Sequence, residues 1–381
     1  MKSVRYHVPT RIFFGPGVAA NLKDIIDREV RAEKFFLVTD KGIIESGIAD
    51  RIIAQLPGVT LFDEIEQNPK HPTIDRAGEE VRKIKPDLII GLGGGSALDA
   101  AKAVALLATN PGKIEEYEGK EKYRHTPLPV LAVPTTCGTG SEVTWVSVVT
   151  HSGRQFKMSI KGPEMYPAAA VIDPDLLSTL PPHLVASTGL DALTHAVEAY
   201  TVKPATFLTD IFAREALGLI FHSIEDAYED IKGKTRAREE IMKGSLLAGL
   251  AFGNSDVGSV HCLSEALGSL LDTPHGVANS VFLPFVMEFN LPAAEKKFAE
   301  IARMVGVTDQ ENTEAAAGLI RFIRILSRRL GIPSFRDTGV KEEQLSILAQ
   351  KAFENNSNPS NPREATKDDY LEILKKAYLI F

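Results

Sequence analysis

The pattern of apolar residues changes near residue 180, and this change restricts the fold more than any other feature of the chain. Before it, short and continuously apolar runs alternate with helical patterns such as 97–109. The strand candidates lie at 34–39, 87–92, 128–133, 145–150 and 169–172. Apolar strands separated by helices are typical of a parallel sheet that is covered on both faces.

After Pro181 and Pro182 the strand patterns nearly vanish and helix-type spacing takes over. The longest such segments lie at 184–201, 207–227 and 236–252. A length of 381 residues suits two domains. We therefore predict an α/β domain over 1–180 and an all-α domain over 181–381, with a cleft between them as the expected place for a ligand.

Composition excludes several classes of partner. The net charge of −7, from 50 acidic and 43 basic residues, provides no basic surface for nucleic acid. No apolar run approaches the roughly 18 residues of a spanning helix, and the N-terminal segment lacks the apolar core of a secretion signal. Two cysteines cannot form a disulfide framework. We therefore expect a cytoplasmic protein that binds neither nucleic acid nor membrane.

Two glycine-rich loops follow strand candidates. Gly91–Ser96 opens a helix, where bare backbone N–H groups and the helix dipole favour a phosphate, and Asp99 lies in the first turn of that helix. Pro134–Glu142 combines glycines with threonine and serine hydroxyls that suit pyrophosphate or ribose. Asp40 ends an earlier strand and could accept ribose hydroxyls while repelling a 2′-phosphate. These features favour NAD over NADP.

Asp191 and His195 stand four residues apart, which places both on one face of a helix. His261 and His275 follow, and one carboxylate with three imidazoles is a plausible set for a divalent transition metal. The other six histidines have no partner at ligand spacing and are expected at the surface or in structural roles. Neither Cys137 nor Cys262 is expected to act as a catalyst.

Together these motifs resemble the iron-containing (group III) alcohol dehydrogenase family. The resemblance runs in order through Gly93–Lys102, Pro134–Thr144, Gly189–Glu198, Val260–His261, Pro274–Asn279 and Asn361–Arg363. It implies a Rossmann-like dinucleotide-binding domain and an α-helical domain that carries one divalent metal, Fe²⁺ or Zn²⁺. The implied metal ligands are Asp191, His195, His261 and His275. The implied NAD contacts are Asp40, Gly94, Gly95, Ser96, Asp99, Thr135, Thr136, Thr139 and Lys157.

The resemblance also implies substrate-pocket walls, formed by Phe252 and by the segment from Trp145 to Val149. Many members of the family carry a histidine four residues after the third metal ligand, but this chain has Glu265 there. Glu265 could carry protons, support His261 or reshape the pocket. The family further implies a homodimer or a larger homo-oligomer.

The implied reaction is hydride transfer between NAD(H) and a small primary alcohol or diol and its aldehyde, with the metal as Lewis acid. One alternative is a hydroxyacid–oxoacid transhydrogenase or another metal-dependent enzyme of the same superfamily; the other is a non-catalytic binding protein. Sites for phosphorylated or acidic substrates need basic residues. Between residues 181 and 222 the chain has only Lys203 and Arg214, and 256–280 has no Lys or Arg, which favours a neutral substrate.

Overall fold

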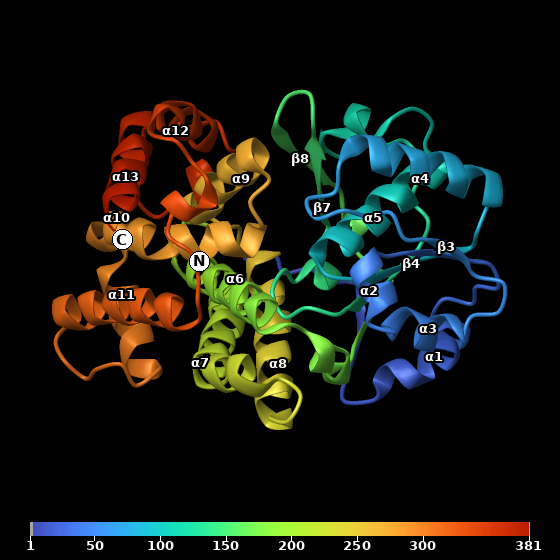
Figure 1. Cartoon of the computed structure of the whole chain (residues 1–381), viewed down its shortest axis with the longest axis horizontal. Helices are drawn as coiled ribbons and strands as arrows, with labels where there is room; N and C mark the ends of the chain where they lie inside the picture. The colour runs from blue at the N-terminus through green and yellow to red at the C-terminus, as the bar shows by residue number, and fades with distance from the viewer. Residues whose placement is uncertain (1–2, 381) are drawn as a thin grey trace. The chain divides into compact units, whose positions relative to one another are not determined.

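The protein is described by a computed structural model that covers residues 3–380. It forms two compact units (Figure 1). One is an α/β unit of residues 7–136 and 140–180, and the other is a helical unit of residues 181–380 together with residues 3–6 and 137–139. The chain therefore passes from one unit to the other between residues 6 and 7 and between residues 180 and 181. It also does so before and after the segment 137–139.

The α/β unit is built on a sheet of six strands in the order β1-β9-β6-β4-β2-β3, and every pairing in it is parallel. Its strands are β1 (Arg11–Phe14), β2 (Phe35–Val38), β3 (Thr60–Phe62), β4 (Leu88–Gly93), β6 (Val130–Pro134) and β9 (Ala169–Ile172). Its helices are α1 (Leu22–Glu29), α2 (Lys41–Glu45), α3 (Ile48–Ile53), α4 (His71–Ile84) and α5 (Gly95–Thr109). This confirms the predicted parallel sheet. The short edge strands β1 and β3 were not predicted.

Helices cover both faces of this sheet (Figure 1). Successive side chains of a strand point to opposite faces, so each buried strand serves two cores. Phe36 and Val38 of β2 pack with residues of α4 and α5. Phe35 and Leu37 pack on the other side with residues of α1 and α3. The unbroken apolar runs that predicted these strands are therefore explained by burial on both sides.

The strand predicted at 145–150 does not join the main sheet. It forms β7 (Val146–His151), which pairs antiparallel with β8 (Phe156–Lys161) in a three-stranded sheet completed by β5 (Gly119–Lys120). The turn at residues 152–155 makes this hairpin, whereas parallel strands need a longer crossover. Val149 is fully buried there among Met158 and Ile160.

The helical unit contains eight α-helices among its described residues. They are α6 (Pro182–Thr201), α7 (Phe207–Asp230), α8 (Thr235–Phe252), α9 (Ser259–Leu271), α10 (His275–Met304), α11 (Asn312–Arg329), α12 (Leu345–Phe353) and α13 (Lys367–Leu379). Nearly every residue of α6 from Val185 onward is buried, so its polar side chains must find partners inside the protein. None of the helices in residues 3–380 combines the length and apolar character needed to span a bilayer.

Candidate metal centre and nucleotide-binding loops

The four predicted metal ligands converge within the helical unit. Asp191 and His195 lie one turn apart on α6, His261 lies in the first turn of α9, and His275 is the first residue of α10. One ligand atom from each of the four lies within 4.8 Å of the others. The first three side chains are buried, and His275 is partly exposed. The site therefore has one side from which a small molecule could approach.

The spacing of these atoms fits a single small cation. Nε2 of His195 and Nε2 of His261 lie 2.9 Å apart, and Oδ1 of Asp191 lies 3.8 Å from Nε2 of His275. A tetrahedral centre with bonds of about 2.0–2.2 Å separates its ligand atoms by roughly 3.5 Å. Buried nitrogen lone pairs that face each other and a carboxylate are stabilised when a cation lies between them. The residues present therefore suit a divalent metal.

Protonation of the imidazoles is set by their surroundings. Burial, only partly offset by the charge of Asp191, lowers the pKa of His195 to about 3, so this ring is neutral and has a lone pair to donate. Burial acts in the same direction on His261. There the hydrogen bond and charge of Glu198, helped by Asp191 and Glu265, outweigh it and raise the pKa of the ring.

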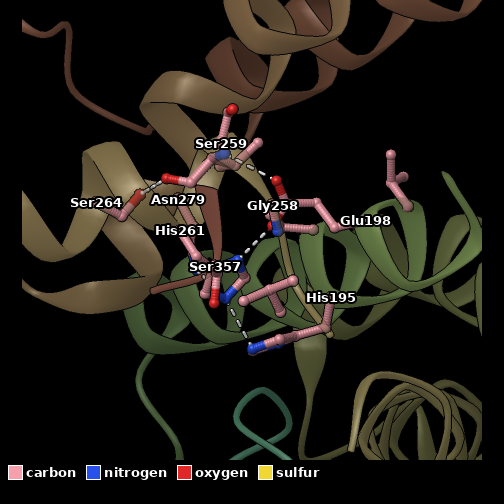
Figure 2. A network of polar contacts seen from close by, with 12 residues as sticks. His195, Glu198, Gly258, Ser259, His261, Ser264, Asn279 and Ser357 are labelled. Atoms are coloured by element: carbon pink, nitrogen blue, oxygen red, sulfur yellow. Dashed lines mark hydrogen bonds and ion pairs between the residues drawn. The ribbon is translucent and has the colours of Figure 1, made fainter. Parts of the chain in front are cut away.

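Glu198, which was not predicted as a functional residue, supports the centre from behind His261 (Figure 2). His261 Nδ1 donates to Glu198 Oε2 at 2.6 Å, which leaves Nε2 directed at the other ligands. The same carboxylate accepts the backbone N–H groups of Gly258 at 2.9 Å and Val260 at 2.8 Å. Glu198 thereby accepts hydrogen bonds from N–H groups at the N-terminus of α9, and it also orients His261.

Asn279 is a second residue that the sequence reasoning missed. Its Nδ2 donates to Asp191 Oδ1 at 2.6 Å and lies 3.2 Å from Nε2 of His261 and 3.1 Å from Nε2 of His275. Helical spacing could have revealed both residues. Glu198 lies seven residues after Asp191 on α6, and Asn279 lies four residues after His275 on α10, so each shares a face with a ligand.

Two predicted pocket residues lie near this centre. The ring of Phe252 stacks on that of His195 with centroids 4.3 Å apart, so it closes one side of the ligand set. Glu265 lies one turn after His261 on α9. Its Oε2 accepts a hydrogen bond from Asn355 Nδ2 at 2.7 Å. The group that supports His261 through a hydrogen bond is Glu198.

In the α/β unit, the two glycine-rich loops lie side by side where β4 and β6 end. The peptide N–H of Thr135 donates to Gly93 O at 3.0 Å, and a β-carbon on Gly94 would lie 3.1 Å from Thr136 Cγ2. Gly94 begins α5 without a side-chain cap, and Gly95 and Ser96 are partly exposed. Thr135 Oγ1 is buried without a hydrogen-bond partner. These groups bring backbone N–H donors and hydroxyls together in a way that suits a phosphate.

Asp40 lies beside these loops, shortly after the end of β2. Its Oδ1 accepts the N–H of Ile43 at 3.1 Å, and its Oδ2 would lie 3.2 Å from a β-carbon on Gly93. Burial raises the pKa of this carboxyl, an effect that the N–H groups of Ile43 and Gly42 oppose.

The order of the strands reverses at this place. From β2 the chain goes outward to β3 and then returns to β4 on the other side of β2. Such a reversal point is where open parallel sheets bind ligands.

The carboxylate of Asp99 is hydrogen-bonded within the α/β unit. It accepts hydrogen bonds from Ser141 Oγ at 2.5 Å and from the N–H of Val148 at 3.0 Å, and it lies 3.6 Å from the buried Lys102 ammonium. Lys102 itself donates to Ser141 Oγ at 2.7 Å. These bonds tie α5 to the end of the second loop, so Asp99 positions that loop.

The other residues predicted to contact the cofactor or the substrate are divided between the two units. Lys157 is nearly buried on β8 and donates to Asn68 Oδ1 at 2.5 Å. Thr139 is partly exposed in the segment 137–139, which belongs to the helical unit. Trp145 is half-buried, with the Lys120 ammonium 5.4 Å from its ring centroid. Val149 is part of the hydrophobic core and has no exposed surface to offer a substrate.

Two histidines that have no other ligand-type residue at helical spacing in the sequence lie in contact in the α/β unit. The rings of His71 and His151 stack with centroids 4.4 Å apart, and His151 Nε2 lies 3.0 Å from Glu115. Each Nδ1 accepts a backbone N–H, from Ser152 at 3.3 Å and from Arg154 at 3.2 Å. Ligand atoms of His71, Glu115 and His151 lie within 4.8 Å of one another, but a ring that accepts at Nδ1 carries its proton at Nε2, which in His151 faces Glu115.

The two cysteines are buried and unpaired, as expected for residues without a catalytic role. Burial raises the pKa of the Cys137 thiol to about 11 and raises that of Cys262 well above its usual value. Both thiols are therefore protonated at neutral pH and are weak nucleophiles.

Comparison with known proteins agrees with this arrangement. Residues 9–174 match the family described as iron-containing alcohol dehydrogenase, and residues 185–378 match the C-terminal part of the Fe-containing alcohol dehydrogenase family. The 1,3-propanediol dehydrogenase of Citrobacter freundii is 39% identical over 382 residues, which cover 98% of each chain.

Two solved structures share the whole fold. The structure of a 1,3-propanediol oxidoreductase has a TM-score of 0.94 and 37% identity and covers 99% of this chain and 100% of its own. Sulfoacetaldehyde reductase from Bifidobacterium kashiwanohense in complex with NAD⁺ has a TM-score of 0.90 and 31% identity and covers 100% of both chains. The chain therefore belongs to the iron-containing alcohol dehydrogenase family and is an oxidoreductase of the alcohol dehydrogenase and aldehyde reductase class.

Proposed function

We propose that this enzyme interconverts a small primary alcohol or diol and its aldehyde, with NAD(H) as the hydride carrier and one divalent metal held by Asp191, His195, His261 and His275. The observation that carries the proposal is the convergence of these four side chains within 4.8 Å. Three imidazole donors and one carboxylate suit ferrous iron and zinc alike. Such a cation would polarise an alcohol or carbonyl oxygen as a Lewis acid.

The residues of the chain hold this ligand set in register. Glu198 keeps His261 in the tautomer that directs Nε2 toward the other ligands. The Asn279 amide orients Asp191 through the 2.6 Å hydrogen bond to Oδ1. Phe252 covers His195 and keeps water from that side of the ring. Pre-oriented ligands lower the reorganisation that the reaction requires.

The loops of the α/β unit support a dinucleotide. The uncapped start of α5, with Gly94, Gly95 and Ser96, presents N–H groups to a pyrophosphate. Thr135 and Thr136 offer hydroxyls beside it, and Thr139 and Lys157 are proposed as further contacts. Asp40 is proposed to accept ribose hydroxyls. The nicotinamide ring supplies the hydride acceptor, while the protein provides binding and orientation.

Relatives of this chain are named for substrates of different charge, since one is a 1,3-propanediol oxidoreductase and another a sulfoacetaldehyde reductase. For this chain a neutral alcohol is supported by the absence of Lys and Arg throughout α6 and throughout 256–280. The two free cysteines support a reducing compartment such as the cytoplasm.

The proposal is tested on protein that is stripped with a chelator and reloaded separately with Fe²⁺ or Zn²⁺. Initial rates are measured for a panel of alcohols with NAD and aldehydes with NADH. Turnover is expected only after reloading and only with added cofactor. Turnover of a hydroxyacid–oxoacid pair without added NAD would instead identify a transhydrogenase, and full activity of the stripped protein would contradict the metal role.

Changing Asp40 to Asn is expected to weaken the discrimination against NADP. The substitution removes a charge that repels a 2′-phosphate, and it keeps an oxygen that can cap α2. Loss of one repulsive charge corresponds to roughly a tenfold rise in the ratio of kcat/KM for NADPH to that for NADH. Asp368→Asn removes an exposed charge from the helical unit and should leave the ratio unchanged. An unchanged ratio in Asp40→Asn would contradict the ribose role.

A further inference from the structure

Glu265 places a third carboxylate close to the metal ligands. It lies four residues after His261 on α9, so both side chains are on one face of the helix. Its charge is one of three carboxylate charges, with Glu198 and Asp191, that act on the His261 ring. Asn355 Nδ2 binds Oε2 of Glu265 at 2.7 Å, and the side chain is partly exposed. The carboxylate is therefore held in a fixed place without being sealed off from solvent.

No Lys or Arg stands in the stretches of sequence around the four candidate ligands. Neither α6 nor residues 245–280 contain Lys or Arg. Asp191 and Glu198 together balance the charge of a divalent cation. Glu265 then leaves the centre with one excess negative charge, which affects the binding of any charged molecule nearby.

The helix dipole of α9 does not offset this excess. Three of the N–H groups at its start are already bonded within the protein. Glu198 accepts those of Gly258 and Val260, and Asn361 Oδ1 accepts that of Ser259 at 3.1 Å. Three N–H groups at this end of α9 are therefore already used, and α6 and residues 245–280 offer an anionic substrate no Lys or Arg.

We propose that Glu265, positioned by Asn355, sets the charge preference of the substrate site, so that neutral and cationic alcohols are accepted and anionic ones are disfavoured. This inference rests on the proposed alcohol dehydrogenase function and deepens it. A fixed unit charge near a half-exposed site changes the relative kcat/KM of two substrates that differ by one charge by roughly tenfold. The effect decreases as ionic strength rises.

The test uses three alcohols of similar size and different charge: choline, 3,3-dimethylbutan-1-ol and 2-hydroxyethanesulfonate. Their kcat/KM values are measured for the metal-loaded wild type and for Glu265→Gln, Asn355→Ala and the control Glu343→Gln. Glu343 is an exposed acid of the same unit and belongs to none of the ligand helices α6, α9 and α10. Assays at low and high salt separate a charge effect from a change of shape.

In Glu265→Gln we expect the ratio of anionic to neutral alcohol to rise about tenfold and the ratio of cationic to neutral alcohol to fall. Asn355→Ala should shift both ratios in the same direction by less, and Glu343→Gln should shift neither. Ratios that stay the same in Glu265→Gln, while the neutral alcohol is turned over, would overturn the inference. If no alcohol is turned over, the proposed function fails, and calorimetric binding of the three compounds still decides the charge preference.

Discussion

Replacing His261 with Ala is expected to abolish metal-dependent turnover while the fold is retained. The substitution removes one of three proposed imidazole ligands from a set whose atoms lie within 4.8 Å of one another. Lewis-acid stabilisation is worth several kcal/mol, so a loss of about 10³-fold or more in kcat/KM is expected. Metal content after dialysis should fall in parallel, and circular dichroism should retain its helical signal.

The matched control is His222→Ala, since His222 is an exposed histidine on α7 of the same unit. It should keep both the metal and the rate. The prediction would be overturned if chelator-stripped His261→Ala kept the wild-type rate, because the reaction would then need neither this ligand nor a cation. If His261→Ala loses its helical signal, the same measurements are made on His275→Ala, because His275 is partly exposed and its removal disturbs the core less.

Replacing Glu198 with Gln should produce the second large effect, on both metal affinity and stability. The carboxylate accepts three hydrogen bonds, from Gly258, Val260 and His261, and an amide offers only one oxygen in its place. Its NH₂ group would face a donor and leave at least one buried N–H without a partner. Changes of this kind behind a ligating histidine typically cost 10- to 100-fold in metal affinity.

The metal affinity of Glu198→Gln is measured by competition with a chromophoric chelator, and the unfolding midpoint is measured on the metal-free protein. Losing a hydrogen bond to a charged group costs about 1.5–3 kcal/mol, so the metal-free protein should also unfold at a lower temperature. A lower midpoint with wild-type metal affinity would show that Glu198 only caps α9. Glu343→Gln, an exposed change in the same unit, should alter neither quantity.

The local sequence pattern was sufficient to predict elements whose residues all have the same kind of surroundings. β4 could be predicted from 87–92 because it is buried on both faces, which requires an unbroken apolar run. The same holds for Asp191 and His195, because a helix brings residues four apart together without help from the rest of the chain. The glycines that open α5 likewise follow from local geometry.

Local pattern failed where a partner lies far away in the sequence. The strand at 145–150 has an apolar character like that of the central strands, yet it pairs with β8 in a separate sheet, where Val149 enters the core. His71 and His151 are 80 residues apart, and a parallel β-bridge between Lys70 and Thr150 brings their segments together. Asp99 could be predicted as a residue near the start of a helix, but its bonds to Ser141 and Val148 could not.

By itself, the sequence determined a parallel α/β half, a helical half, the glycine-rich loops and the identity of the four candidate ligands. The first three depend on periodicity and residue type, which short stretches of chain express directly, whereas the full ligand set followed from the resemblance of the motifs to a known family. The tertiary structure decided that α6, α9 and α10 bring those ligands together, that Glu198 and Asn279 orient them, and that Asn355 holds Glu265 beside them. These contacts join residues up to 90 positions apart, and only the packing of buried helices specifies them.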